Sequence, residues 1–337
     1  MKFRHFAFFI ILILLAVLLL RNGGHLEDLW RLLRQVNLLI LALILPVRYG
    51  YYWANTRFYQ HFYRLYNKKL SYQELFPAVI SMNFLNTVIP SGGVSGLTYF
   101  TKVFEKKVTH RQALLAQSFW YIAVLASFGL VMGLSFVTLI LTNSVSPASY
   151  RFVLVLALII IFAVFLVFAL SLNELVLTKA LFVATRPANW VMKLLKRPAI
   201  TEAHIKRFAD GYHDLVDLFR AQPRTAVRPF MDALMTMAVE IVSISIIFLA
   251  FGKLVNPAVV GMAYILAMVF SIASIFTNGV GAYEATMVAA FTALGQPLEL
   301  SLSVTALYRL IAMWLFIPFG LYYYRHQTVV MPDREEG

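Results

Sequence analysis

The chain has 337 residues, of which 61% are hydrophobic and 13% charged, about half the charged share of ordinary soluble domains. Several stretches run about 20 residues almost without charge, the length that a helix needs to cross a bilayer, so the composition excludes a soluble enzyme and indicates a polytopic helical membrane protein. The absence of cysteine excludes disulfides, thiolate catalysis and cysteine-ligated metals, and the seven scattered histidines lack the spacing of a zinc site, so we expect no metal and no cofactor.

The first expected span is Phe3–Leu20, an apolar run that follows Lys2 and Arg4. A signal peptide would look similar, but no small-x-small cleavage site follows, so we expect a retained helix. Further apolar segments follow in the order Leu38–Trp53, Ala113–Leu141, Phe152–Leu172, Ile241–Phe251 with its flanks, and Leu300–Tyr324. Tyrosine and tryptophan gather at several of their ends, as the aromatic residues of membrane interfaces do.

Two other segments are interrupted by glycine. Ser71–Ile89 opens with a predicted capping box that pairs its first residue with Glu74. It ends at Pro90-Ser91-Gly92-Gly93, after which a short segment follows. Pro257–Asn278 likewise ends at Gly279-Val280-Gly281 before a second short segment. Each interrupted segment is either a full crossing or one limb of a re-entrant hairpin that returns to its own side of the membrane.

The distribution of positive charge distinguishes these two arrangements, because lysine and arginine in short loops stay cytoplasmic. With two hairpins and the N-terminus inside, 23 of the 29 Lys and Arg residues lie inside and 5 outside, with Arg48 counted in a cytoplasmic loop and Arg309 within a span. If both segments cross fully, 11 lie inside and 17 outside. Hairpins are therefore favoured, and topology and anionic headgroups explain the net charge of +13 better than nucleic acid does.

The hairpin arrangement predicts an all-α fold of six full spans and two oppositely oriented re-entrant hairpins, forming an inverted repeat within one transmembrane domain, residues 1–337. Residues 1–141 are the first half and residues 142–337 the second, which contains a cytoplasmic insertion at residues 173–228. Apolar residues at helical spacing from Ile205 to Phe219 predict an amphipathic helix there, lying along the headgroups or, alternatively, binding a partner. Inverted repeats whose broken helices meet near the midplane are typical of secondary transporters.

The first candidate site is the glycine-rich break after the first interrupted segment. Pro90 ends the preceding helix because it lacks an N–H group. Irregular backbone at membrane depth must be buried by protein or line a cavity, and the N–H groups that open the next segment could bind an anion such as phosphate. An interfacial turn with a small-residue helix contact is an equal alternative. The residues assigned to this site are Asn86, Pro90, Ser91, Gly92, Gly93, Ser95 and Gly96.

The second candidate site joins the other glycine break, with Asn278, Gly279 and Gly281, to three ionisable residues of apolar segments, namely Glu240, Glu284 and Arg309. Charges inside a bilayer are costly unless they are paired or wetted, so a functional role is the default interpretation. Arg309 lies about nine residues, or roughly 13 Å at helical rise, from the nearer end of its segment. It therefore needs Glu284 or Glu240 as a partner. A lipid phosphate could compete with that carboxylate for the guanidinium of Arg309.

A buried structural ion pair is the alternative for these three charges. Asp232 is close to an expected helix start, and we interpret it as a cap.

Together, Asn86–Gly96 with the following Ala113, Gly279–Glu284, Ala306–Arg309 and Trp314–Gly320 resemble the marks of the flippase-like, lysylphosphatidylglycerol synthase transmembrane-region family, over essentially the whole chain. The chain departs from the family pattern at Phe276-Thr277-Asn278, where a proline is usual. It also departs at Val94-Ser95-Gly96, where an acidic residue and an arginine are frequent.

In the aminoacyl-phospholipid members of that family, the membrane region moves the modified lipid across the bilayer, and a separate soluble acyltransferase domain makes it. Since the chain stops about ten residues past its last span, the resemblance implies lipid translocation without synthase activity.

We therefore expect a protein of the bacterial inner membrane, with both termini cytoplasmic, that moves a phospholipid or a lipid-linked headgroup between leaflets. We do not expect an enzyme, because motifs for nucleotide binding, zinc proteolysis and nucleophilic catalysis are missing. A secondary transporter of a small anionic solute and a non-catalytic scaffold are the alternatives. The expected partners are anionic or zwitterionic membrane lipids and not nucleic acid, and a second copy of the chain or a separate lipid-modifying enzyme could join them.

Overall fold

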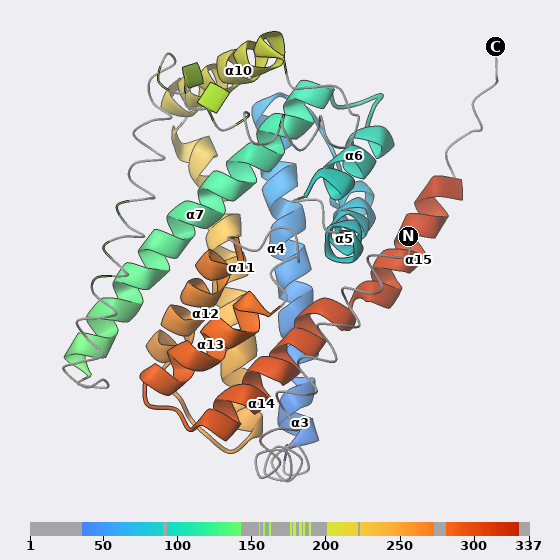
Figure 1. Ribbon diagram of the computed structural model, residues 1–337. Helices are drawn as coiled ribbons and strands as arrows, with labels where there is room; N and C mark the ends of the chain where they lie inside the picture. Colours follow the sequence, from blue (N-terminus) through green and yellow to red (C-terminus); the bar gives the residue numbers. More distant parts are fainter. Residues whose placement is uncertain are drawn as a thin grey trace.

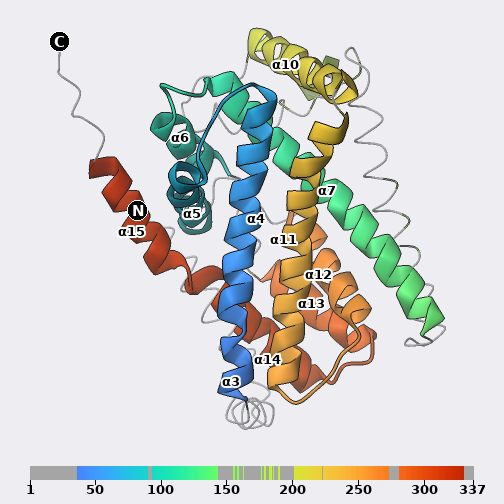
Figure 2. The ribbon, with the colours of Figure 1, turned by 180° about the vertical axis from the view of Figure 1, so that it is seen from behind.

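The computed structural model describes residues 36–89, 93–142, 201–221, 223–272 and 281–329, with a few isolated positions between residues 155 and 189. Within these residues the chain is helical and contains no strand (Figures 1 and 2), so the predicted all-α class is confirmed. The expected span Phe3–Leu20 and most of Phe152–Leu172 lie outside the described residues.

The helices keep the order of the sequence, and their bounds are α3 Leu38–Ala42, α4 Ile44–Leu65, α5 Tyr72–Val88, α6 Val94–Val103, α7 His110–Leu141, α10 Glu202–Ala221, α11 Pro223–Ala250, α12 Pro257–Ile272, α13 Ala282–Ala293, α14 Leu298–Arg309, the π-helical turn η2 Leu310–Trp314, and α15 Ile317–Val329. Among the described residues, three stretches are long and apolar enough to cross a membrane: His110–Leu141, Val227–Ala250 and Leu298–Gln327. These agree with a membrane protein with transmembrane helices, while the count of six spans stays a prediction.

Helices α4 and α11 run side by side through the middle of the bundle (Figures 1 and 2). One hydrophobic core lies among α7, α11, α12, α13 and α14, where Phe248 and Phe291 are fully buried. A second core lies among α4, α5, α6 and α7, where Tyr63 stacks on Phe100 with 6.0 Å between ring centroids. Lipid is as apolar as these side chains, so close packing, rather than a hydrophobic driving force, holds the helices together.

Two helix pairs have the same construction, because α5 is followed by the shorter α6 and α12 by the shorter α13, and the members of each pair pack together. α6 begins after Gly93, with φ 92°, and α13 after Gly281, with φ 91°; residues with a Cβ rarely adopt this conformation. The 10 residues of α6 and 12 of α13 extend roughly 15 and 18 Å, against about 30 Å for a bilayer core. Neither α6 nor α13 is long enough to cross alone, as the hairpin interpretation requires.

The start of α5 is tied to the turn after α6. Ser71 and Glu74 form the predicted capping box, since each backbone N–H donates to the other's side chain, at 3.1 and 3.2 Å. Lys107 Nζ also donates to Glu74 Oε1 at 2.6 Å. The hydrogen bond from Lys107, followed by that from the Ser71 backbone, holds the pKa of the Glu74 carboxyl below its usual value.

Helix α10 lies across one end of the bundle, over α7 and α11 (Figure 1). It occupies part of the insertion that the sequence assigns to residues 173–228. Ile205 and Tyr212, two of the apolar residues at helical spacing, are buried together with Ala209. Arg111 at the start of α7 donates to Asp214 of α10 at 2.8 Å, an exposed contact. One face of α10 is therefore packed on the bundle.

The last long helix contacts both helix pairs. Its α14 part packs on α13, and its α15 part packs on α5. A Cβ atom placed on Gly320 of α15 would lie 2.3 Å from Cβ of Phe84 in α5, so the two backbones approach closely there. The π-helical turn η2 separates these two contacts, and π-helical turns frequently occur at functional sites.

Helices α5 and α6 also approach closely, at Gly96. A Cβ atom at this position would lie 2.5 Å from Asn86 Oδ1 and 2.6 Å from the carbonyl oxygen of Met82. The Gly96 N–H donates to Asn86 Oδ1 at 2.9 Å. Because one of the obstructing atoms belongs to backbone, a side chain at Gly96 must push the two helices apart.

Gly96→Ala should therefore destabilise the protein by about 1–3 kcal/mol, the usual cost of overpacking, although alanine is normally the better helix former. Gly133→Ala in α7 is the matched control, since a Cβ there meets nothing within 4 Å. The measurement is the thermal unfolding midpoint of the detergent-solubilised protein. Equal midpoints for the two variants would contradict the close approach.

Candidate functional site

One ion pair lies sealed inside the bundle, between Arg48 of α4 and Glu240 of α11. Their side chains are only 3% and 7% exposed. Tyr308 of α14 donates its hydroxyl to Glu240 Oε2 at 2.9 Å, and the guanidinium of Arg48 lies 4.8 Å from the centre of the Tyr51 ring. Three helices thus meet at a unit without net charge, which lowers the cost of removing both charges from water.

A second ion pair, Arg309 with Glu284, is more accessible. Arg309 Nε donates to Glu284 Oε1 at 2.5 Å, and the side chains are 19% and 25% exposed. Glu284 Oε2 accepts the N–H of Gly281 at 2.6 Å, so this carboxylate also caps α13. The guanidinium lies 4.5 Å from the centre of the Tyr283 ring.

Arg309 keeps unused hydrogen-bonding capacity. Its Nη2 atom is buried and has no hydrogen-bond partner among the described residues. A guanidinium has five N–H groups in a planar fork that matches a carboxylate or a phosphate. Arg309 is therefore a fixed cation at a helix break, and its Nη2 atom can donate a hydrogen bond to a second anionic oxygen.

The two ion pairs are neighbours because Tyr308 and Arg309 are consecutive, and η2 begins at the next residue. The ring of Tyr308 stacks on Tyr283 at 6.4 Å between centroids and meets Tyr264 of α12 edge-on, also at 6.4 Å. Residues of α4, α11, α12, α13 and α14 therefore form one polar and aromatic cluster. No group of three His, Asp or Glu residues suited to a metal occurs in the described parts of the chain.

The structure distributes the predicted ionisable residues over both pairs. Arg309 has Glu284 as its partner, one of the two carboxylates that the sequence indicates, whereas Glu240 is taken by Arg48. The assignment of Arg48 to a cytoplasmic loop is wrong, because the residue is buried in α4. Arg48 lies within the apolar segment Leu38–Trp53, and a charge in such a segment needs a buried partner, as argued for Arg309. The sequence therefore contained a signal for this ion pair.

The interpretation of Asp232 as a helix cap is also wrong. Asp232 lies nine residues inside α11, is buried, and contacts Nδ1 of His61 of α4 at 2.5 Å. No local pattern indicates this partner, because the two residues are 171 positions apart.

The first candidate site is described in part. Asn86 Oδ1 accepts hydrogen bonds from Gly96 N and from Ser95 Oγ, at 2.9 and 3.4 Å. Gly93 provides the positive φ that starts α6. These contacts hold α5 and α6 close together at their junction. The other residues of this candidate site, Pro90, Ser91 and Gly92, lie outside the described residues. The same is true of Asn278 and Gly279 of the second site.

We expect the sealed pair to stabilise the fold. Arg48→Met strands the Glu240 carboxylate and should cost about 3–5 kcal/mol, while the double variant Arg48→Met, Glu240→Leu should recover most of that loss. Lys107→Met, which removes the exposed pair with Glu74, is the control and should cost at most about 1 kcal/mol. Unfolding in detergent micelles measures all three, and a double variant as unstable as Arg48→Met would disprove the coupling.

Comparisons with known proteins agree with the membrane character of the fold. The model of the family described as the lysylphosphatidylglycerol synthase TM region matches residues 6–320. A UPF0104 membrane protein of Methanothermobacter thermautotrophicus is 21% identical over 327 residues, covering 91% of this chain and 90% of its own length. No solved structure matches. Since the family match spans both helix pairs and both ion pairs, the chain belongs to the lysylphosphatidylglycerol synthase transmembrane-region family.

Proposed function

We propose that this protein moves a phospholipid, or a lipid-linked headgroup, between the two leaflets of its membrane. The observation that carries the proposal is the accessible Arg309–Glu284 pair beside a helix break. Membership of a family named for a lipid synthase's membrane region supports a lipid-related role.

A phosphate meets its largest barrier in the apolar middle of a bilayer, where a fixed guanidinium offers charge-assisted, bidentate hydrogen bonds. Arg309 uses Nε for Glu284 and keeps Nη2 free of hydrogen bonds to the described residues. A phosphate oxygen that reaches the buried Nη2 atom can thus form a hydrogen bond before Glu284 leaves. Glu284 keeps its bond to Gly281 when Arg309 turns to the lipid, which reduces the cost of the exchange.

The arrangement proposed around this site is an inverted repeat of six spans with two re-entrant pairs, α5–α6 and α12–α13. The glycines that open the second member of each pair, Gly93 and Gly281, are 188 residues apart. Re-entrant helices from opposite faces bring polar backbone to the midplane, where it replaces headgroup hydration. The acyl chains stay in lipid while the headgroup passes between helices.

The proposed location and orientation rest on the distribution of Lys and Arg in the sequence. We place the protein in the inner membrane of a bacterial cell, with both termini and α10 cytoplasmic, working without catalysis of its own. A separate lipid-modifying enzyme would supply the lipid, and a second copy of the chain is a further candidate partner. A transporter of a small anionic solute is the second candidate function, because the Arg309 guanidinium would bind such a solute equally well.

Purified protein in liposomes should accelerate the exchange of anionic or zwitterionic lipid between leaflets, as measured by accessibility to a membrane-impermeant quencher. Arg309→Ala should slow the exchange about 10–100-fold, the effect of losing a charged hydrogen bond worth about 1.5–3 kcal/mol. Glu284→Gln keeps a capping side chain on α13 but removes the charge, and should also slow it. Lys107→Gln, which is exposed and far along the chain from the site, should not.

These assays should cover several headgroups, with and without a proton gradient. Equal rates in empty and protein-containing vesicles for every headgroup would refute lipid translocation. Exchange unaffected by both site variants would leave the function and reject the site. Uptake of a soluble anion without lipid exchange would select the second candidate function.

The orientation can be tested with single cysteines, because the native chain has none. Asp217 on α10 and Leu254 in the turn after α11 are both exposed, the latter at 92%. Helix α10 and the turn after α11 lie at opposite ends of the bundle (Figure 1). An impermeant maleimide should label Leu254→Cys in intact cells, and Asp217→Cys only after permeabilisation. Labelling of Asp217→Cys from outside would contradict the proposed topology.

A further inference from the structure

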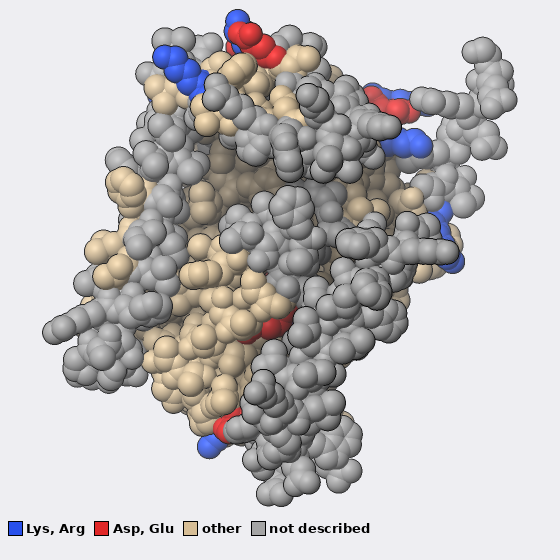
Figure 3. Space-filling model, viewed as in Figure 1, with Lys and Arg blue, Asp and Glu red and all other residues tan. Residues whose placement is uncertain are grey.

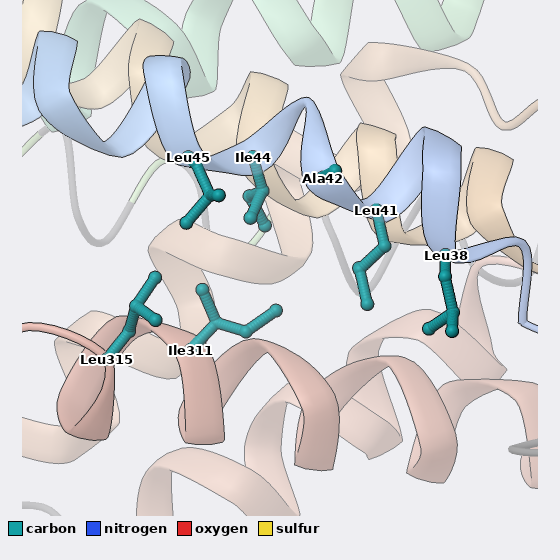
Figure 4. Close-up of a pocket in the computed structure, with 7 residues that line it drawn as sticks. All are labelled: Leu38, Leu41, Ala42, Ile44, Leu45, Ile311 and Leu315. Atoms are coloured by element: carbon teal, nitrogen blue, oxygen red, sulfur yellow. The ribbon is translucent and has the colours of Figure 1, made fainter.

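An apolar groove opens between α3–α4 and η2. It has a volume of about 230 Å³, and its seven lining residues, which include Leu41, Ala42 and Leu45 on one side and Ile311 and Leu315 on the other, are all apolar (Figure 4). Leu45 is exposed, and so are Leu310 and Trp314 beside the groove on η2. The groove therefore faces outward between helices of a membrane protein.

The lining restricts what can occupy the groove. A water molecule needs two to four polar partners, and the lining side chains offer none, while an anion would find no donor. A hydrocarbon chain fits these constraints, because an apolar cavity of about 150 Å³ holds the six carbons of benzene and the groove thus holds roughly nine.

The groove also has an orientation. Leu38 lines one end of the groove and follows Asn37, whose N–H donates to the carbonyl of Ala250 at the end of α11 at 2.9 Å. Lys253, three residues after Ala250, is exposed and places a cation at the same end of the bundle. Beyond Leu45 and Leu315, Tyr52 and Phe316 pack together with 4.6 Å between ring centroids. A chain in the groove would thus have its charged end near Lys253 and its methyl end towards the bundle centre.

We propose that this groove binds one acyl chain of a membrane phospholipid from the leaflet on the Asn37 side. Ile44 lies one helical turn from Arg48, and Ile311 one turn from Tyr308, so the bound chain ends beside the sealed ion pair. This site goes beyond the proposed translocation, which leaves the acyl chains in bulk lipid, and it does not depend on it.

The test is photolabelling of the full chain in nanodiscs with a phosphatidylglycerol that has a diazirine within one acyl chain, followed by mass spectrometric mapping. The expected result is severalfold stronger labelling of Leu38–Leu45 and Leu310–Leu315 than of Leu130–Leu141, an apolar, partly exposed stretch of α7. Ala42→Phe, at an exposed position within the groove, should reduce that labelling to the level of α7. Leu134→Phe on α7 is the matched control and should not.

Equal labelling of the groove and α7 would overturn the proposal, since it would mean contact with bulk lipid only. Labelling that survives Ala42→Phe would overturn it as well. An unlabelled groove, filled by a second copy or by another segment of this chain, would do the same. The experiment detects binding without transport, so its failure is distinguishable from a failure of lipid exchange in liposomes.

Discussion

The ion pair between Arg48 and Glu240 fixes how the two central helices fit together. Neither charge reaches water, so α4 and α11 can slide or rotate against each other only by separating the charges in an apolar environment. The pair also orients a third helix, because Tyr308 of α14 bonds to the same carboxylate. The direction of Arg309, the next residue, thus follows from a contact in which it takes no part.

The two ion pairs differ in how readily a partner can be exchanged. Arg48 and Glu240 are buried, with side chains only 3% and 7% exposed, which leaves little surface for a competing ion. Arg309 and Glu284 are partly exposed, and each has a second interaction on its own side, Arg309 with the Tyr283 ring and Glu284 with the Gly281 N–H. Because Glu284 keeps its hydrogen bond to the start of α13, it can release Arg309 and stay in place. Such a carboxylate is suited to be an exchangeable counter-ion. This difference is the reason for proposing a structural role for the first pair and a binding role for the second.

The sequence predicted the elements whose signals are local. The capping box at Ser71 and Glu74 and the glycine that opens α13 follow from residues close in sequence, and the need of Arg309 for Glu284 or Glu240 follows from a single costly charge. What it missed depends on contacts between distant segments. Arg48 and Glu240 are 192 positions apart, and His61 and Asp232 are 171 apart; each pair requires knowing that α4 lies against α11, which no periodicity reveals. Arg48 was overlooked for a second reason, because a positive residue near aromatic side chains also matches the pattern of a membrane interface.

The π-helical turn η2 after Arg309 divides the last long helix into two parts, α14 before it and α15 after it. One part is held against α13 by the Arg309–Glu284 pair, and the other is pressed against α5 where Gly320 meets Phe84. Helices bend most easily where their regular hydrogen bonding is interrupted, and here that point is one residue from the accessible cation. Relative movement of the two helix pairs, α5–α6 and α12–α13, should therefore bend the last long helix at η2. The contact between Arg309 and Glu284 and the angle between α14 and α15 would then change together.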